Sequence, residues 1–262
     1  MVLFLLYCFE LKKRIRKPSK PKTKYQKIII MSILFGALLV GGTVATFTNV
    51  GKNQNNDATK KAQAEQLISI LTNASVPGAQ ALGASKAPIT IVEFGDYQCP
   101  YCATFNNETK NNLTDNYIDK GIAKFIFKDL IINDLPKDRL SSLAAEASYC
   151  AAEQDRYWPY HDELYNNYKG ENTGWISKAS LIEFAKDVKI NNIEQFTSCL
   201  DSHKYSQIVM KNDLFGKEIG LGTTPTFFFL KQNSTKVAAI QGFHPYSVFK
   251  NVIDQLLVNS SI

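Results

Sequence analysis

The pattern of hydrophobic and polar positions begins with one long apolar run. Residues 28–47 read IIIMSILFGALLVGGTVATF and include no charged side chain. At 1.5 Å rise per residue, a helix of this length crosses the roughly 30 Å hydrocarbon core of a bilayer. A buried core helix rarely runs so far without an ionisable group. The pattern therefore predicts a transmembrane anchor.

A polar stretch follows the apolar run. Residues 48–87 are dominated by Asn, Gln, Lys, Gly and Ala, and we expect a linker. Within it, Asp57 could cap a helix that runs to about Thr72. The apolar residues that share one face of this helix are Leu67, Ile68 and Leu71.

From residue 88 onward, the pattern is that of an α/β domain. A β-prone run at 88–94 is followed by a segment with a loose helical stripe that closes at Gly121, and then by a second strand at 122–127. Strands joined by a helix are expected to pair in parallel with a right-handed crossover. Further on, the pattern predicts a strand at 225–230, its hairpin partner at 236–240 and a last helix at 245–258.

The region between these two halves, about 130–219, reads as helices. Leu140, Leu143, Ala147 and Cys150 follow one another at spacings of three, four and three residues, which places Cys150 on an apolar helix face. Ile193, Phe196 and Cys199 (or Leu200) repeat this pattern. We therefore expect an inserted helical domain with two buried cysteines.

Charge changes the meaning of the apolar run. The chain has a formal net charge of +6, but residues 1–27 hold nine basic and one acidic side chain, 9 − 1 = +8, which leaves −2 for the rest. A slightly acidic body argues against a nucleic-acid groove. Cations directly before a span belong on the cytoplasmic side, so the domain after it faces outward. Thr43 and Ala45 would suit a signal peptidase, but the length of the segment favours a retained anchor.

The five cysteines divide according to this topology. Cys8 precedes the span and is expected to be incidental. Cys99, Cys102, Cys150 and Cys199 follow it, in a compartment where disulfides persist. A C-x-x-C pair such as Cys99–Cys102 can be half a metal site, a redox dithiol or chance.

The context of the C-x-x-C pair favours redox chemistry. Cys99 stands where a strand gives way to a helix, so the unpaired N–H groups of the helix N-terminus would stabilise its thiolate. This makes Cys99 the expected nucleophile. Cys102, one turn into the helix, is the expected resolving thiol, and Pro100 suits the first helical position.

The phrase from Ile91 to Cys102, IVEFGDYQCPYC, resembles the DsbA-like branch of thiol–disulfide oxidoreductases. The resemblance covers roughly residues 85–258 and includes Thr224-Pro225 at the start of a strand. It implies a thioredoxin fold with the helical domain inserted at 130–219. It also implies a cis Pro225 facing the dithiol and a Thr224 backbone that binds peptide, with Pro100 and Tyr101 beside it.

The same resemblance assigns a role to Glu93, six residues before Cys99. A carboxylate at this place can accept the proton of the resolving thiol. Lys128, at the end of the next strand, is a candidate partner for it. The inner pair is Pro-Tyr and not the Pro-His of the best-known DsbA. A tyrosine brings no imidazolium charge to the thiolate, so a strongly oxidising potential is not implied.

Two further groups of residues have a structural interpretation. Because Cys150 and Cys199 lie on buried faces in an oxidising compartment, we expect a structural disulfide between them, as some DsbA-like proteins have. Two buried free thiols, or one zinc ion held by all four outer cysteines, are the alternatives. Tyr157–Asp162 resembles the family's W-x-Y-H-D segment, and we expect His161 and Asp162 to serve in packing and capping at a helix start and not in acid–base chemistry.

These observations predict an anchored, outward-facing oxidoreductase that introduces disulfides into unfolded exported polypeptides with free cysteines. No metal or organic cofactor and no nucleic acid is expected to bind. By resemblance, a DsbB-like or VKOR-like membrane quinone reductase would recycle the dithiol. One alternative is a membrane-tethered reductase or isomerase. Another is a non-catalytic, disulfide-stapled binding module on the cell surface.

Overall fold

The computed structural model describes residues 81–235 and 237–258, together with 64–73 and the single residues 59, 62 and 79. The predicted cytoplasmic segment 1–27 and the predicted span 28–47 lie outside the described residues, as does Cys8. Among the described residues, no helix combines the length and the apolar character that crossing a membrane requires.

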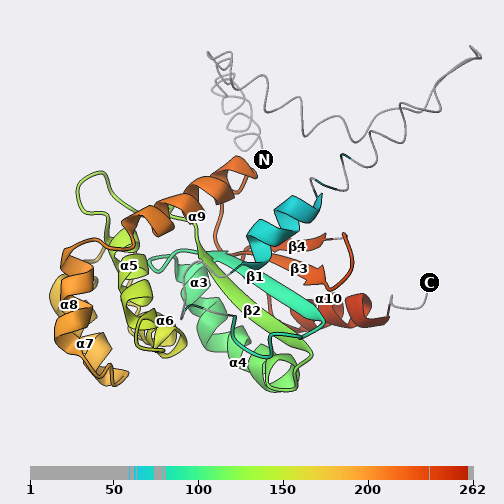
Figure 1. The fold of residues 1–262 in the computed structure, drawn as a ribbon, viewed down its shortest axis with the longest axis horizontal. Helices are drawn as coiled ribbons and strands as arrows, with labels where there is room; N and C mark the ends of the chain where they lie inside the picture. Colours follow the sequence, from blue (N-terminus) through green and yellow to red (C-terminus); the bar gives the residue numbers. More distant parts are fainter. Residues whose placement is uncertain are drawn as a thin grey trace, which may run out of the picture. The chain divides into compact units, whose positions relative to one another are not determined.

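A four-stranded sheet forms the centre of the domain, with the strand order β2-β1-β3-β4 (Figure 1). β1 (Ile89–Gly95) is buried along its whole length and pairs in parallel with β2 (Ala123–Asp129). β3 (Thr226–Lys231) runs antiparallel to β1, and β4 (Val237–Gln241) runs antiparallel to β3. The predicted strands and their parallel pair are thus confirmed to within about two residues.

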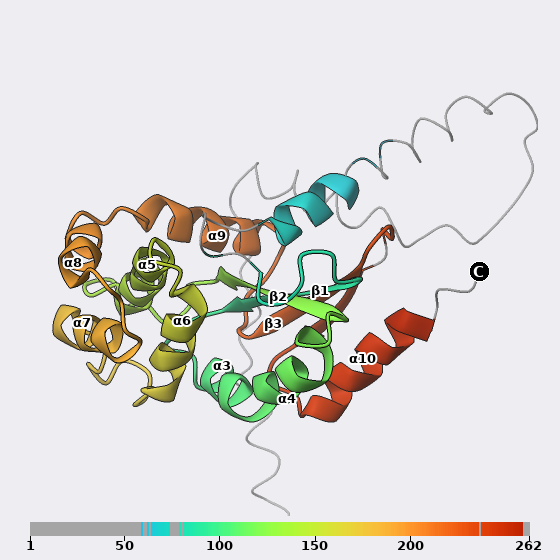
Figure 2. The same ribbon diagram turned by 60° about the horizontal axis from the view of Figure 1, so that its bottom comes forward.

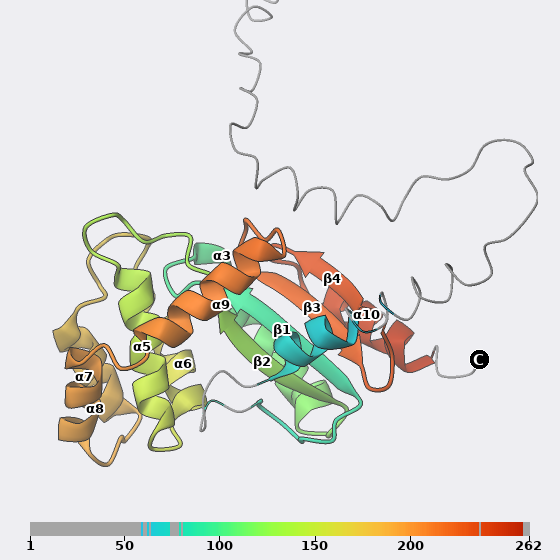
Figure 3. The same ribbon diagram turned by 45° about the horizontal axis from the view of Figure 1, so that its top comes forward.

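Helices cover both faces of the sheet. Because side chains alternate along a strand, Ile91 of β1 faces one side and Val92 the other. On the Ile91 side lie the helix that follows the dithiol and α10 (Tyr246–Val258), which contribute Phe105 and Phe249 (Figure 2). On the Val92 side lie α9 (Ser206–Glu218) and the helical residues 64–72 (Figure 3).

The helix that follows the dithiol is not regular. It consists of α3 (Pro100–Phe105), a π-helical segment η3 (Asn106–Lys110), α4 (Asn111–Leu113) and a second π-helical segment η4 (Thr114–Ile118). After it, Gly121 takes a positive φ of 69°, which closes the element where the sequence predicts. The π-helical segments were not expected, because a pattern read at 3.6 residues per turn contains no signal for them.

Five helices stand between β2 and β3, as the predicted insertion requires. They are α5 (Leu140–Ala152), α6 (Tyr157–Asn166), α7 (Lys178–Asp187), α8 (Ile193–Asp201) and α9. Their apolar faces form one core that extends to the dithiol. Asp134 caps α5 from outside the helix, because its carboxylate accepts hydrogen bonds from the backbone N–H groups of Ser141 and Ser142 at 2.7 and 3.2 Å.

Part of the segment expected as a linker packs on the sheet. Leu71 is 1% exposed and contacts the cluster of Val92 and Phe94. Lys128 donates a hydrogen bond to the carbonyl oxygen of Asn73 at 2.9 Å. The composition of residues 64–73 is polar and most of these residues are exposed, but one apolar face, with Leu71 at its centre, is enough to pack this short helix on the sheet. The folded domain therefore begins before residue 88.

Candidate active site

The dithiol lies where β1 leads into α3, at the boundary between the sheet and the helical insertion. Cys99 is the N-cap residue of α3 and has an extended backbone, while Pro100 occupies the first helical position. Of the described cysteines, Cys99 and Cys102 carry free thiols. Cys99 is 3% exposed and lines a groove, whereas Cys102 is fully buried. A partner molecule can therefore reach the first sulfur only.

Several hydrogen bonds lower the pKa of the Cys99 thiol to about 7. The largest contribution comes from the thiol of Cys102, which outweighs the opposite effect of burial on that pKa. The side chain of Thr224 and the backbone N–H groups at the start of α3 lower the pKa further. Cys99 is therefore the group in this pair that can be a thiolate near neutral pH.

Cys102 differs from Cys99 because it has no access to water. Burial raises its pKa well above the ordinary value of a thiol. The neighbouring Cys99 and Glu93 raise the same pKa further. The two sulfurs thus have opposite chemical characters: an accessible thiolate and a buried thiol that holds its proton.

The segment before β3 faces the dithiol. The Thr224–Pro225 peptide bond is cis. The Cys99 thiol lies 3.3 Å from the carbonyl oxygen of Thr224, to which it donates a hydrogen bond. The carbonyl oxygen of Pro225 accepts from the N–H of Gly242 at 2.7 Å, which joins this segment to the end of β4.

A groove of about 520 Å³ opens over Cys99. Tyr101, 61% exposed, and Ile132, 41% exposed, give it an apolar rim. Thr223 and Thr224 line the other side, next to the end of β4. Tyr97, two residues before Cys99, does not reach this groove and lies in the core, where its hydroxyl is 3.0 Å from Nδ1 of His161.

Asp96 holds the backbone of Ile132 and Asn133, which form one wall of this groove, and the sequence patterns did not single it out. Its carboxylate accepts hydrogen bonds from the N–H groups of Gln98, Ile132 and Asn133 at 2.8, 2.9 and 2.9 Å. Burial raises the pKa of Asp96, while these hydrogen bonds act in the opposite direction. The sequence signal for this role was the position of Asp96, an acidic residue directly between a buried strand and the C-x-x-C pair.

Glu93 lies beneath the dithiol, on the Ile91 side of the sheet. It is 1% exposed, and among the described residues its Oε1 has no hydrogen-bond partner. Burial raises the pKa of the Glu93 carboxyl well above its ordinary value, and the nearby charges of Cys99 and Asp162 add to this. The carboxyl is thus a buried acid within electrostatic reach of both sulfurs.

The suggested pairing of Glu93 with Lys128 is wrong. In the β1–β2 register, Glu93 stands opposite Phe127, and Lys128 stands opposite Phe94. Since neighbouring residues of a strand point to opposite faces, Lys128 belongs to the other face of the sheet. The cation near Glu93 is Lys110 from η3, which lowers the pKa of the Glu93 carboxyl.

His161 and Asp162 lie inside α6, which begins at Tyr157, and neither caps it. His161 is fully buried and packs against Phe127 at 4.7 Å between ring centroids. Burial lowers the pKa of His161 well below its usual value, so the ring is neutral. Asp162 forms an ion pair with Lys110. The expected packing role is therefore present, and the expected capping role is not.

Cys150 of α5 and Cys199 of α8 form a disulfide that spans 49 residues of sequence. A zinc ion held by the four outer cysteines would need both of these sulfurs as free thiolates. The structure therefore removes the zinc alternative and the alternative of two free thiols.

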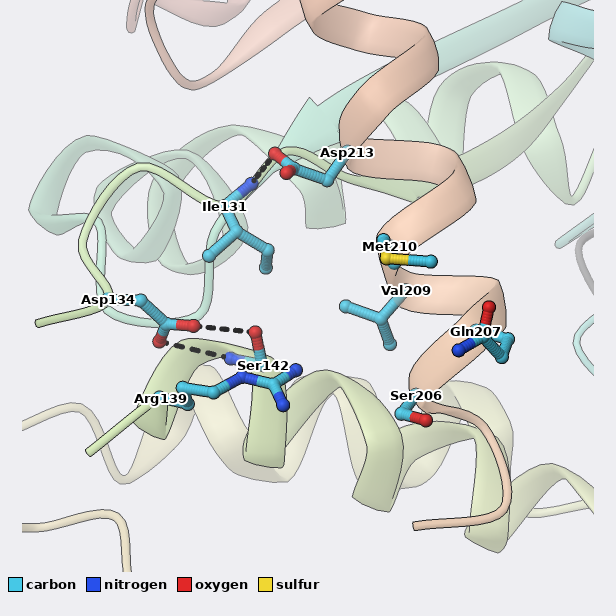
Figure 4. A pocket seen from close by; sticks show the side chains of 9 residues that line it. All are labelled: Ile131, Asp134, Arg139, Ser142, Ser206, Gln207, Val209, Met210 and Asp213. Atoms are coloured by element: carbon cyan, nitrogen blue, oxygen red, sulfur yellow. Dashed lines mark hydrogen bonds between the residues drawn. The ribbon is translucent and has the colours of Figure 1, made fainter. Parts of the chain in front are cut away.

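A second cavity of about 390 Å³ lies between α9 and the segment after β2 (Figure 4). Ile131 and Asp134 line it, whereas Ile132 and Asn133 line the groove over Cys99. One extended segment thus separates the two spaces. In the second cavity, Asp213 of α9 accepts a hydrogen bond from the N–H of Ile131 at 2.9 Å.

Comparisons with known proteins agree with this arrangement. The family model described as thioredoxin matches residues 75–244. Disulfide bond formation protein D of Bacillus subtilis is 30% identical over 183 residues, which cover 70% of this chain and 79% of that protein.

Solved structures of disulfide oxidoreductases are also similar to this chain. The crystal structure of oxidised BdbD from Bacillus subtilis is similar with a TM-score of 0.61 at 29% identity, and the match covers 69% of this chain and 93% of that one. The structure of alpha-DsbA1 from Wolbachia pipientis, at 22% identity and a TM-score of 0.59, covers 70% and 96% and shares the fold. The chain therefore belongs to the thioredoxin family and is a protein disulfide oxidoreductase of the DsbA-like branch.

Proposed function

We propose that this protein is an extracytoplasmic dithiol oxidase that introduces disulfides into exported polypeptides. The observation that carries the proposal is the contrast between the two sulfurs of the C-x-x-C pair. The pKa of Cys99 is lowered to about 7, while that of Cys102 is raised. A sulfur with a lowered pKa is a good leaving group, which favours transfer of the disulfide to a client.

The reaction begins from the oxidised Cys99–Cys102 disulfide. A client thiolate attacks Sγ of Cys99, the S–S bond breaks, and Cys102 leaves as a thiolate that takes up a proton. A second client thiolate then attacks the client sulfur of the mixed disulfide, and Cys99 leaves as a thiolate. The client loses two electrons and gains one disulfide, and the enzyme disulfide takes up both electrons and becomes a dithiol.

Glu93 is proposed to handle the proton of Cys102. Its buried carboxyl can give a proton to the departing Cys102 thiolate and take it back when the enzyme disulfide re-forms. The segment Thr224-Pro225, together with Pro100 and Tyr101, is proposed to hold the client peptide in the groove over Cys99. The backbone groups of Thr224 and the exposed ring of Tyr101 support this assignment.

The proposed location rests on the sequence before the domain. A charge of +8 over residues 1–27 and the apolar run 28–47 support a single membrane span with the N-terminus in the cytoplasm. The buried Cys150–Cys199 disulfide is consistent with an oxidising compartment outside. The electrons would pass on to a DsbB-like or VKOR-like quinone reductase in the same membrane.

An equilibrium redox titration of the dithiol tests the direction of transfer. A potential between about −120 and −180 mV supports the oxidase, and one near about −270 mV supports a tethered reductase. A thiol pKa of about 7 resembles that of thioredoxin more than the value near 3.5 of DsbA. Within the oxidase range, a thiol pKa above that of DsbA favours a potential near about −180 mV over one near about −120 mV, because the reduced form is less stabilised.

Trapping of clients tests the activity itself. In the variant Cys102→Ala, the Cys99 thiolate can attack a disulfide already present in an exported protein and displace one of its thiolates. The resulting mixed disulfide is expected to accumulate, because no resolving thiol is present to break it. The Cys99→Ala variant is the matched control and should form none. Absence of adducts in Cys102→Ala, with an unaltered phenotype in Cys99→Ala, would favour the surface binding module instead.

A further inference from the structure

A buried ion pair lies close to Glu93, and the dithiol chemistry described so far does not use it. Lys110 of η3 is 3% exposed and forms an ion pair with Asp162 of α6. Its Nζ also lies 5.5 Å from the centroid of the Trp158 ring. A buried ammonium group is costly unless its charge is balanced, so such a pair needs a reason to be retained.

The ring contacts of α6 place this ion pair in the same layer as Glu93. In the register of the sheet, Glu93 stands opposite Phe127 on β2. The ring of Phe127 lies 4.7 Å from that of His161, the residue before Asp162. The ring of Trp158, over which Lys110 lies, is 5.8 Å from Phe125, two residues earlier on the same strand face. Both charged groups therefore lie on the face of the sheet that carries Glu93.

We propose that Lys110 and Asp162 are positioning residues for the Glu93 carboxyl, with the Lys110 ammonium stabilising the carboxylate and Asp162 holding that ammonium in place. This inference rests on the proposed proton exchange between Glu93 and Cys102. When Glu93 gives its proton to the Cys102 thiolate, a negative charge appears on a carboxyl that water does not reach. Lys110 supplies the opposite charge, and the proton returns to Glu93 when the enzyme disulfide re-forms.

The electrostatic balance at Glu93 supports a direct role for Lys110. After burial, Lys110 has the largest influence on the pKa of Glu93 and lowers it, while Cys99 and Asp162 raise it. The attraction by Lys110 thus exceeds the repulsion by Asp162, although the two form a pair. Asp162 has a side chain that is 41% exposed, so water screens its charge more than that of Lys110.

Besides burial, the charges that shift the pKa of Glu93 are those of Lys110, Cys99 and Asp162. Asp129, whose pKa burial raises to about 6, is also ionised near pH 7, and its charge adds to the rise that burial causes in the pKa values of Tyr97 and Tyr157.

The remaining titratable groups near Glu93 stay neutral. Burial lowers the pKa of His161 and raises the pKa of Cys102, and it also raises the pKa values of the surrounding tyrosines. These tyrosines, whose pKa values are all raised, are Tyr97, Tyr157 and Tyr165. Lys110 and Asp162 are therefore the charged side chains through which Glu93 can be tuned.

The test uses the full chain with Lys110→Gln, Asp162→Asn and the double substitution. Each single change breaks the same ion pair, so a purely structural effect would act in the same direction in both. An electrostatic effect would instead shift the pKa of Glu93 in opposite directions in the two single variants. Lys110→Gln should raise the pKa of Glu93 by about one unit and Asp162→Asn should lower it, with the double variant between them.

Two measurements report this effect. The first is the pH titration of the ¹³C-labelled glutamate carboxyl signal that disappears in Glu93→Gln. The second is the pH profile of the rate at which Cys102 resolves a mixed disulfide between Cys99 and glutathione. At pH values below the pKa of Glu93, the rate follows the ionised fraction of its carboxyl, so a one-unit rise of that pKa corresponds to a roughly tenfold slower step in Lys110→Gln.

An exposed ion pair provides the matched control. Lys178 of α7 pairs with Asp201 of α8, and both side chains are about half exposed. Lys178→Gln should leave both readouts unchanged. The proposal would be overturned if the pKa of Glu93 shifts in the same direction in Lys110→Gln and Asp162→Asn, or if it shifts in neither. If Lys110→Gln does not fold, the sign of the Asp162→Asn shift decides alone, since a raised or unchanged pKa of Glu93 contradicts the inference.

This test of Lys110 and Asp162 is independent of the experiment that traps exported proteins. Glutathione replaces the client in the kinetic readout, so the role of Lys110 can be measured even where no exported protein is trapped on Cys102→Ala. Absence of trapped clients would then contradict the proposed oxidase alone.

Discussion

The thiol of Cys102 has the largest influence on the acidity of Cys99, and its removal is therefore informative. The pKa of Cys99 is about 7, against an ordinary value of 9.0. At pH 7, about half of the Cys99 side chains are then thiolates, compared with about 1% for an unperturbed thiol, a difference of roughly 50-fold. Cys102→Ala removes the donor, and we expect the Cys99 pKa to rise by about one to two units.

Cys102→Ser is the matched variant, because it keeps a donor at nearly the same place. Its Cys99 pKa should stay close to about 7. The measurement is the pH dependence of the rate of alkylation by iodoacetamide, together with thiolate absorbance in the ultraviolet. A Cys8→Ser background leaves Cys99 as the reacting thiol, since Cys150 and Cys199 are bonded to each other.

The reasoning would be refuted in either of two ways. If Cys102→Ala keeps a Cys99 pKa near 7, the backbone N–H groups of α3 and the side chain of Thr224 hold the thiolate without the second sulfur. If Ser and Ala raise the pKa equally, packing around residue 102 controls it, and no hydrogen bond does.

Three further predictions concern stability. Removing the Cys150–Cys199 disulfide, which spans 49 residues, by a double change to Ala should lower the free energy of unfolding by about 4 kcal/mol in urea titrations, and a loss below about 1 kcal/mol would contradict this. Burial raises the pKa of Asp129 from 3.8 to about 6, so the native state binds its proton more tightly than the unfolded state. The resulting stability is present below about pH 4 and is lost as the pH rises to about 6. The loss amounts to about 3 kcal/mol, and Asp129→Asn should abolish this part of the pH dependence. A Cβ on Gly216 would lie 2.9 Å from Cδ1 of Leu130. Gly216→Ala should therefore cost about 1–3 kcal/mol in thermal unfolding, and an unchanged midpoint would show that Leu130 moves aside freely.

Local patterns predicted the parts of the fold that depend on local order. The strands around residues 89–95 and 226–231 are apolar and β-prone, and the C-x-x-C pair follows the first of them directly. Cys150 and Cys199 each occupy an apolar helix face, which sufficed to predict that both would be buried. The resemblance to DsbA-like proteins added what no local pattern contains, namely that Thr224-Pro225 meets the dithiol.

Groups brought in from other elements were missed. Lys110 stands in the run NNETKNN, which reads as a solvated helix face. It is buried at the end of the π-helical segment η3. A pattern read at 3.6 residues per turn misplaces such side chains, because one extra residue in a turn rotates later side chains by about 100° about the helix axis. Lys128 was wrongly predicted as the partner of Glu93. Side chains alternate along a strand, and this alternation places Lys128 on the face of the sheet opposite to Glu93.

Two of the three hydrogen bonds of Asp96 also have a consequence for the thermodynamics of client binding. They fix the backbone of Ile132 and Asn133 while the domain folds. The conformational entropy of that groove wall is therefore lost during folding and not during binding. If a client peptide binds against Ile132 as proposed, the backbone of this wall adds no ordering cost, which favours the binding of short unfolded segments.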